Sequence, residues 1–243
     1  MSRSGDLATR GRLMPRRAAD DRGASARRPT QSPDAALACA QMDQLAPRVL
    51  AWAAPLCFRR IETDAERDAA YRLRYEAVVE RGWASAADFP DRRERDAFDL
   101  RAVLIGGFDG ERLVATKRLV FPLPGLPLPI ESIYGLTVHP RGQVVDWGRT
   151  VVAPGLGGAS HRALAALLAL AWQETRARGY HHVCGDFSPA MLRLYRRLGV
   201  RVTVLGPAAH YAGETRHPIM LHPETSIHGL NVWFARSASR DST

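Results

Sequence analysis

The sequence is poor in several residue types that mark particular classes of protein. Its 243 residues include one lysine, Lys117, one asparagine, Asn231, and three scattered cysteines, Cys39, Cys57 and Cys184. Cysteines at these spacings form neither a disulfide framework nor a zinc-binding pattern, which predicts a cytoplasmic protein in a reducing compartment. No apolar run approaches the roughly 18 residues of a membrane-spanning helix, and the N-terminus lacks the apolar core of a secretory signal.

Positive charge is abundant, and almost all of it is arginine. The formal net charge is +9. Residues 1–57 contribute +4 from nine arginines and five acids, and residues 58–222 contribute +5 from 23 basic and 18 acidic side chains. This arginine bias is as typical of GC-rich coding as of a function, so we predict no nucleic-acid partner. A basic domain face is still expected to attract an acidic partner through electrostatic steering.

Composition divides the chain into four parts. Residues 1–34 are rich in Arg, Ala, Ser and Asp without apolar periodicity, which predicts a disordered segment. Residues 35–55 predict a helical lead-in, an amphipathic helix pair broken near Pro47. This lead-in is expected to pack on the domain, and a peripheral contact with a membrane surface stays open. Residues 56–222 carry the patterned domain, and residues 223–243 form a weakly patterned tail.

Strand and helix signals alternate in a definite order between residues 56 and 222. A strand at 56–61 precedes a helix that begins with the capping box of Thr63 and Glu66 and runs to about Arg81. Asp109-Gly110 joins two strands as a hairpin, and the proline-rich segment 122–129 predicts a stiff extended connector. There follow a strand at 143–153, a helix at 159–178, a strand at 181–187, a helix at 188–199, and short strands near 200–205 and 216–221. This order predicts an α/β fold with one mixed central sheet and helices on both faces.

The stretch VDWGRTVVAPGLGG, residues 145–158, leads from the central strand into the next helix. A helix N-terminus preceded by glycines offers free N–H groups and the positive end of the helix dipole to a phosphate. Together with the element order, this stretch resembles the GNAT acyltransferase superfamily. The resemblance implies a GNAT-like mixed sheet whose helix start holds the phosphate of coenzyme A or phosphopantetheine. The matching cofactor-binding residues are Val151, Val152, Gly155, Gly157, Gly158 and Ala159, although the Arg or Gln that usually opens the motif is missing. The alternative is a tight strand-to-helix turn without a ligand.

Three further segments carry a narrower resemblance. The segments YRLRYEAVVERGW (71–83), ERDAFDLRAVLIG (94–106) and DWGRTVV (146–152) resemble the acyl-homoserine-lactone synthases and the related N-acyl amino acid synthases. In those families a helix supplies an arginine, an E-x-D-x-x-D segment supplies acids, and the central strand supplies an acid and an arginine. The resemblance implies a catalytic pair, Asp146 and Arg149. It also implies a substrate-binding set, which consists of Arg74, Trp83, Asp96 and Asp99.

The residue types of this set suit the acylation of an amine. A primary amine must lose a proton before or during its attack on a thioester, and Asp146 is the expected acceptor, directly or through water. The arginines Arg74 and Arg149 are expected either to pair with the acids of the set or to clamp the carboxylate of an amino-acid acceptor. Residues three apart on a regular strand face opposite ways. Asp146 and Arg149 therefore converge only if the strand bulges, and Gly148 is the expected place.

Tyr195 is a further catalytic candidate. It lies where many acetyl-coenzyme-A-dependent GNAT enzymes have a tyrosine that protonates the leaving thiolate, and a core position is the alternative. Neighbouring arginines are expected either to dock an acidic carrier protein or to form a solvated face; they are Arg193, Arg196, Arg197 and Arg201. His181 and His182 predict no metal site, because adjacent strand residues face opposite ways and no third ligand is suitably spaced.

These observations predict an N-acyltransferase. It would move a long-chain acyl group from acyl carrier protein, or from coenzyme A, to the α-amine of an amino acid. No tightly bound cofactor or metal is expected, and the acyl-phosphopantetheine or acyl-coenzyme A is a donor substrate. Three alternatives stay open: an acyl-homoserine-lactone synthase that uses S-adenosylmethionine, an acetyl-coenzyme-A-dependent acetyltransferase, and a non-catalytic module that binds a carrier protein or ligand. Val78 stands where the lactone synthases have an aromatic residue, which disfavours the first alternative.

Overall fold

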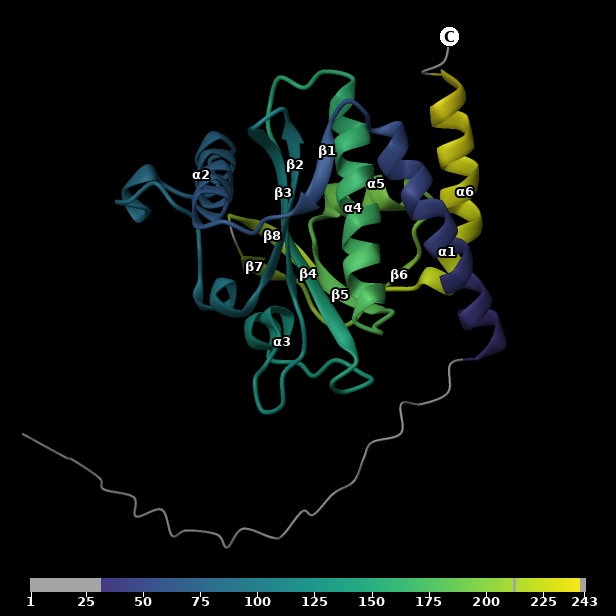
Figure 1. Ribbon diagram of the computed structural model, residues 1–243. Helices are drawn as coiled ribbons and strands as arrows, with labels where there is room; N and C mark the ends of the chain where they lie inside the picture. Colours follow the sequence, from purple (N-terminus) through teal and green to yellow (C-terminus); the bar gives the residue numbers. More distant parts are fainter. Residues whose placement is uncertain (1–31, 212, 241–243) are drawn as a thin grey trace, which may run out of the picture. The chain divides into compact units, whose positions relative to one another are not determined.

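The computed structural model describes residues 32–211 and 213–240, so the segment predicted as disordered lies almost entirely outside the described residues. Its sheet has eight strands in the order β1-β2-β3-β4-β5-β8-β6, with β7 paired to β8 (Figure 1). Adjacent strands are antiparallel, except that β4 and β5 are parallel. The strands are β1 Cys57–Arg60, β2 Val103–Asp109, β3 Arg112–Val120, β4 Val144–Val152, β5 His182–Phe187, β6 Val202–Val204, β7 Ala209–Tyr211 and β8 Glu214–Leu221.

Helices cover both faces of this sheet, as predicted. Helix α2 packs on β3 and β4 from one side, while α4 packs on β1 to β4 from the other (Figure 1). Helices α1 and α6 form a further layer outside α4, and α5 packs on β5 and β8. The helices are α1 Pro33–Trp52, α2 Asp64–Glu80, α3 Pro129–Tyr134, α4 Ala159–Ala177, α5 Pro189–Arg197 and α6 Pro223–Arg240, with short 3-10 turns at Ala86–Asp88 and Ala97–Arg101.

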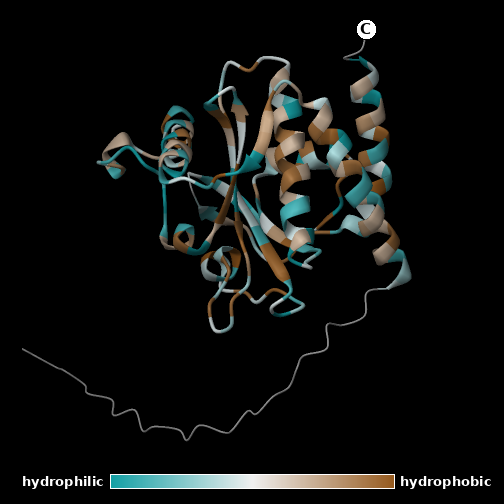
Figure 2. Cartoon of the chain, viewed as in Figure 1, coloured by the Kyte–Doolittle hydropathy of each residue, from teal (hydrophilic) through white to brown (hydrophobic). Residues whose placement is uncertain are grey.

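Local signals account for the first half of the sheet. Thr63 accepts from the backbone N–H of Glu66 and completes the predicted capping box at the start of α2. The Asp109-Gly110 turn joins β2 to β3, and Gly110 has a φ of 60°, which glycine adopts without steric cost. Hydrophobic residues concentrate on the strands and on the helices next to them (Figure 2). The core between sheet and α4 includes Ile105, Leu119, Val145, Ala163 and Leu167.

Two expectations about the chain ends need correction. The segment expected to break near Pro47 is one continuous helix, α1, with the proline inside it. A proline removes one backbone donor, but Leu45, Ala46 and Val49 around it are buried against other helices, so packing offsets the lost bond. The weakly patterned tail forms helix α6, whose Ile227 and Phe234 are buried in the same cluster. Short α3 and β7 were also not predicted.

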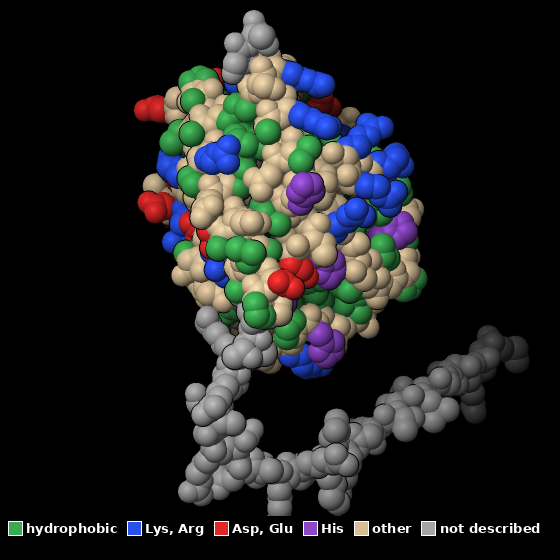
Figure 3. All heavy atoms as spheres, turned by 90° about the vertical axis from the view of Figure 1, so that its right-hand side faces the viewer, with side chains coloured by type: hydrophobic (Ala, Val, Ile, Leu, Met, Phe, Trp, Pro, Cys, Tyr) green, Lys and Arg blue, Asp and Glu red, His purple; other side chains and the backbone are tan. Residues whose placement is uncertain are grey.

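The outer layer is joined to α4 by polar contacts as well as by packing. On the face formed by α1 and α6, basic side chains gather along one edge (Figure 3).

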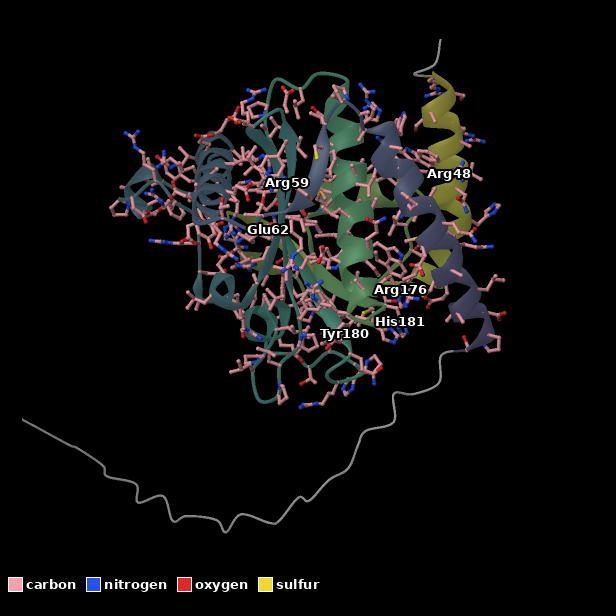
Figure 4. The ribbon with its side chains drawn as sticks, viewed as in Figure 1. Arg48, Arg59, Glu62, Arg176, Tyr180 and His181 are labelled. Atoms are coloured by element: carbon pink, nitrogen blue, oxygen red, sulfur yellow. The ribbon has the colours of Figure 1, made fainter. Side chains whose placement is uncertain are left out.

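Arg176 reaches from α4 toward α1 (Figure 4), and its Nε lies 3.2 Å from Oδ1 of Asp43. The indole N–H of Trp172 donates to the same carboxylate oxygen at 2.7 Å. None of the helices in the described part of the chain combines the length and apolar character required to cross a membrane.

Candidate active site

Strand β4 is distorted at its centre. Arg118 of β3 pairs with Gly148 and Thr116 pairs with Val151, so Arg149 and Thr150 together stand opposite the single residue Lys117. Such a two-against-one arrangement is a β-bulge. Arg149 has a φ of 51°, a conformation that non-glycine residues rarely adopt. The bulge therefore lies directly after Gly148, the position expected from the sequence.

The same strand separates from its parallel neighbour. Strands β4 and β5 pair only through Val144–Asp146 and His182–Cys184. At the next position the strands still lie close, because a Cβ on Gly185 would come within 2.7 Å of the Trp147 carbonyl oxygen. Beyond it the ladder ends, and a cavity of about 310 Å³ is lined by both strands and by α2, α3, α5 and β8. Five of the predicted catalytic and substrate-binding residues line this cavity, whereas Asp96 and Asp99 do not; the five are Arg74, Trp83, Asp146, Arg149 and Tyr195.

Arg74 of α2 is the most enclosed charged side chain of the site, with 1% of its surface exposed. Its Nη1 and Nη2 atoms bind Oδ1 and Oδ2 of Asp99 at 2.7 and 3.1 Å. Its Nε donates to Oε2 of Glu94 at 2.5 Å. Burial opposes ionisation of Asp99, but the hydrogen bonds and charge of Arg74 outweigh it and lower the pKa of this carboxyl below its usual value.

Two further arginines extend this network across the cavity wall. Arg118 Nη1 binds Asp96 Oδ1 at 2.6 Å and Asp99 Oδ2 at 3.0 Å. Arg149 Nη2 donates to Asp96 Oδ2 at 3.1 Å and to the Tyr211 hydroxyl at 2.7 Å, and its Nε lies 3.0 Å from a Glu94 oxygen. The expected alternative of mutual pairing is therefore the one observed. These arginines are occupied by carboxylates and do not offer a free clamp to an acceptor.

Asp146 lies apart from this network, with 3% of its surface exposed. Its Oδ2 accepts from the backbone N–H of Ile130 at 3.0 Å and lies 4.0 Å from the Cys184 thiol. Burial raises the pKa of Asp146 to about 7, against the opposing charge of Arg118 and the Ile130 hydrogen bond. The bulge does not bring Asp146 and Arg149 into contact, because Arg149 turns toward Glu94 and Asp96. The two share a cavity wall rather than an ion pair.

A second, apolar cavity of about 100 Å³ adjoins the first, and we refer to it as the apolar chamber. Trp147 and Tyr195 line both spaces. Side chains from α1, α4 and α6 close the chamber, among them Leu45, Ala169 and Trp233. Tyr195 is buried, and burial raises its pKa above the usual value. The Cys184 thiol beside Asp146 is buried as well.

The first cavity, of about 310 Å³, is referred to below as the polar cavity. Its outer rim is aromatic and basic. The Trp83 ring lies between two guanidinium groups, with Arg81 4.8 Å and Arg216 5.3 Å from the ring centroid. Arg216 is held by Asp186 at 2.6 Å and Glu214 at 2.7 Å. Among the described residues, Arg81 has no carboxylate partner. Trp83 thus forms a wall of the cavity, and Arg81 is a cation available beside it.

The glycine-rich turn forms an open surface at the start of α4. Gly155 and Gly157 have φ values of 84° and 51°, and Gly158 is the N-cap. A Cβ on any of these three would meet no atom within 4 Å. The N–H groups of Ala159 and Ser160 already donate to turn carbonyls, at 2.9 and 3.2 Å. Val151 and Val152 lie in the β3–β4 ladder just before the turn.

The family of this chain follows from its match to a family model. A family model described as N-acyl amino acid synthase FeeM matches residues 69–222, more than half of the chain. The chain belongs to the FeeM family of N-acyl amino acid synthases. Membership in the FeeM family makes it an acyltransferase, as the sequence predicted. No curated protein is similar to it in sequence.

Solved structures support the fold assignment for this FeeM-family chain. FeeM itself, an N-acyl amino acid synthase from uncultured soil microbes, has a TM-score of 0.55 at 20% identity over 73% of this chain and 92% of that chain. The acyl-homoserine-lactone synthase LasI has a TM-score of 0.57 at 18% identity, over 72% and 93%. BjaI, a coenzyme-A-dependent acyl-homoserine-lactone synthase solved with S-adenosylmethionine and isopentyl-coenzyme A, has a TM-score of 0.54 at 22% identity, over 70% and 81%. These likenesses show that the chain shares the fold of these synthases, in agreement with the predicted α/β architecture around one mixed sheet.

Several residues of this candidate site had no role in the predictions from the sequence. Glu94 opens the E-x-D-x-x-D segment and had a signal, but Arg118, Lys117 and Tyr211 lay outside every quoted motif. The expected orientation of the two histidines was wrong. His181 precedes β5 rather than lying in it, and its ring is 4.0 Å from that of His182.

Proposed function

We propose that this chain transfers an acyl group from a phosphopantetheine or coenzyme A thioester to the α-amine of an amino acid. The observation that carries the proposal is the junction of two unlike cavities at Trp147 and Tyr195. A polar space lined by Asp146 suits the amine, and an apolar chamber suits the acyl chain. The thioester carbon would lie between them, beside the opening where β4 and β5 separate.

Asp146 is the proposed acceptor of a proton from the incoming ammonium group. A carboxylate with a pKa near 7 takes up a proton at neutral pH more readily than an ordinary aspartate, and general bases are most effective near the working pH. The neutral amine would attack the thioester carbon, forming a C–N bond while the C–S bond breaks. Tyr195 is the proposed hydrogen-bond donor to the leaving sulfur, because its hydroxyl keeps its proton at neutral pH.

The acceptor is proposed to be an amino acid because of Arg81. The arginines Arg74 and Arg149 are held by carboxylates, whereas Arg81 stacks on Trp83 at the rim without a described acidic partner. A guanidinium binds a carboxylate in a bidentate manner. An acceptor bound there would direct its amine inward toward Asp146, which lines the same cavity.

The donor is proposed to be bound at two places. The open turn of Gly155, Gly157 and Gly158 would accept a phosphate, helped by the dipole of the 19-residue helix α4. An acyl carrier protein would dock on the exposed arginines around α5, whose positive charge complements an acidic protein; they are Arg193, Arg196, Arg197 and Arg201.

The test is mass spectrometry of products from the purified full chain. One reaction contains acyl carrier protein loaded with acyl groups of several lengths, mixed amino acids and S-adenosylmethionine. A second replaces the carrier with acetyl- and long-chain acyl-coenzyme A. N-acyl amino acids are expected, and Asp146→Asn should abolish them. An acyl lactone would assign the chain to lactone synthesis, acetylated products alone would assign it to acetyl transfer, and no product from any donor would refute the proposal.

A further inference from the structure

Lys117 is the single lysine of the chain and lies in the middle of β3, directly opposite the bulge of β4. It is 3% exposed and lines the polar cavity together with Asp146. No sequence motif assigns it a role, and it lies outside the ion-pair network of Arg74, Arg118 and Arg149. A buried ammonium beside a reaction cleft needs a physical reason, because desolvation of a charge is costly.

The protein uses only part of the hydrogen-bonding capacity of the Lys117 amine. Its Nζ lies 2.7 Å from Oγ1 of Thr150 and 5.3 Å from the centroid of the Trp147 ring. Within residues 32–211 and 213–240, Thr150 is its only hydrogen-bond partner and no carboxylate lies within ion-pair distance. An ammonium has three N–H groups, so donor capacity remains for a molecule in the cavity. Both contacts come from β4, because Thr150 is one of the two bulge residues and Trp147 lies before them.

The groups around Lys117 favour the neutral amine. Ala115 and Leu119, two positions away on β3, pack against Ala163 and Leu167 of α4, so that helix brings apolar side chains to this face. Burial lowers the pKa of Lys117 to about 7, while the carboxylates of Asp146 on β4 and Asp186 on β5 oppose the decrease.

Other arginines that line the cavity are held by carboxylates. Arg118 and Arg149 are bound to carboxylates, and Arg216 is bound to Asp186. Arginine does not lose its proton near neutral pH. Lys117 and Asp146 both line the cavity, and burial brings the pKa of each to about 7.

We propose that Lys117 is a catalytic proton carrier, which takes a proton from the attacking nitrogen and returns it to the leaving sulfur. The inference rests on the acyl transfer proposed above. The incoming ammonium gives its first proton to Asp146 and then attacks. As the C–N bond forms and the C–S bond breaks, the nitrogen gives its second proton to the neutral Nζ of Lys117. The ammonium so formed passes that proton to the thiolate, leaving an amide, a thiol and one proton on Asp146 for release to solvent.

The alternative acid in the cavity is less suited to this step. A free thiol has a pKa of about 8.5. Tyr195 holds its proton more tightly than a thiol, so full transfer from its hydroxyl to a thiolate is uphill. An ammonium that is more acidic than a thiol gives up its proton downhill. Tyr195 would then hydrogen-bond the sulfur, while Lys117 supplies the proton.

A first experiment measures the lysine directly and needs no substrate. Full-length protein labelled with lysine carrying ¹³C at Cε gives a single lysine signal, because the sequence has one lysine. The signal is expected to titrate near pH 7, and Asp146→Asn should move its midpoint lower by removing an opposing carboxylate. A midpoint at the ordinary value for lysine, above pH 10, would overturn the inference.

A second experiment compares Lys117→Met and Lys117→Arg with wild type, and Arg112→Met serves as the matched control. Arg112 lies on the same strand but is exposed. Both Lys117 variants are expected to lower kcat by about 100-fold or more with KM for the acceptor changed only a few-fold, and to remove the ionisation near pH 7 that belongs to Lys117 from the kcat profile. Arg112→Met should match wild type. Circular dichroism and thermal melting check that each variant folds.

The outcomes separate the inference from the proposed function. If wild type makes no N-acyl product, the proposed function fails. If wild type is active and Lys117→Arg is equally active, positive charge alone is sufficient and proton transfer by Lys117 is refuted. Full activity of Lys117→Met would refute any catalytic role. A stable increase in intact protein mass equal to one acyl group on Lys117 would also refute it, because an acylated amine cannot carry a proton.

Discussion

Arg74 and Asp99 form a two-point ion pair that is almost closed to solvent, with N–O distances of 2.7 and 3.1 Å. The pair joins α2 to the 3-10 turn that precedes β2 and fixes one wall of the polar cavity. Because both charges are buried, each is stabilised by its partner in place of water.

Arg74→Ala is therefore expected to destabilise the protein strongly. Removal of one partner leaves Asp99 and Glu94 buried without their counter-charge, which typically costs about 3–5 kcal/mol. Urea unfolding measures the loss. Arg72→Ala is the matched control on the same helix, because its ion pair with Asp68 is exposed and such pairs contribute about 0–1 kcal/mol. Equal effects of the two substitutions would contradict the buried-pair interpretation.

Asp146→Asn is expected to stabilise the protein in a pH-dependent manner. The folded-state pKa of Asp146, about 7, lies above that of the unfolded chain, about 3.9. The folded state therefore holds a proton that the unfolded state releases, and stability falls as pH rises from about 4 to about 7. Asparagine lacks this penalty and can still accept from Ile130. Thermal melting at pH 4 and pH 8 should show a gain for the variant only at pH 8.

Ala169→Leu is expected to shorten the preferred acyl chain. Ala169 lines the apolar chamber, and additional methylenes in a filled space cost about 1–3 kcal/mol. We expect kcat/KM for the longest accepted acyl group to fall roughly 10-fold, with short chains unaffected. Ala177→Leu, at an exposed position of the same helix, is the control. An unchanged chain-length profile would show that the acyl group lies elsewhere.

Arg81→Ala is expected to raise the KM for the amino acid. A hydrogen-bonded charge pair contributes about 1.5–3 kcal/mol, so the rise should be roughly 10-fold or more. The amino acid's carboxamide lacks the charge and serves as the control substrate. Wild type should prefer the acid over the amide, and the variant should lose that preference. A preference that survives in the variant would place the carboxylate at another cation.

Reversal of charge at Arg193, Arg196 and Arg197 tests whether an acyl carrier protein docks on this surface. Replacement of all three by glutamate should slow association with an acidic carrier, raise the KM for the acylated carrier, and reduce its salt dependence. Turnover with acyl-coenzyme A in the same variant is the internal control, because this donor needs no protein surface. Equal loss with both donors would indicate damage to α5 instead.

Local sequence signals predicted the elements that local chemistry determines. The capping box of Thr63, the Asp109-Gly110 turn and the glycines before α4 each depend on a few neighbouring residues, and each lies as expected. Helix α6 and strand β7 depend on partners distant in the sequence: Phe234 is buried against α1, and the Tyr211 hydroxyl accepts a hydrogen bond from Arg149 of β4. Single-sequence patterns carry little information about such contacts.

The site shows the same division. The acids and arginines of the quoted motifs were predicted as site residues because their spacing resembles a family, and the bulge followed from the geometry of a strand. The sequence did not reveal which groups pair with each charge. Arg118 and Lys117 line the cavity from β3, which lies outside the quoted motifs. The burial that raises the pKa of Asp146 is likewise a property of the assembled fold, not of its neighbours in the chain.

Part of the wall of the apolar chamber comes from helices on both sides of the segment that matches the family, α1 before it and α6 after it. Trp52 of α1 lies 5.9 and 5.7 Å from Trp233 and Phe234 of α6, so the two outer helices close over α4 together. Under the proposed function, part of the lining that measures chain length then lies on stretches of sequence separate from the reacting groups. Substitutions in the outer helices can accumulate without disturbing Asp146 or Lys117. Such an arrangement lets natural selection change the product while the chemistry is inherited intact.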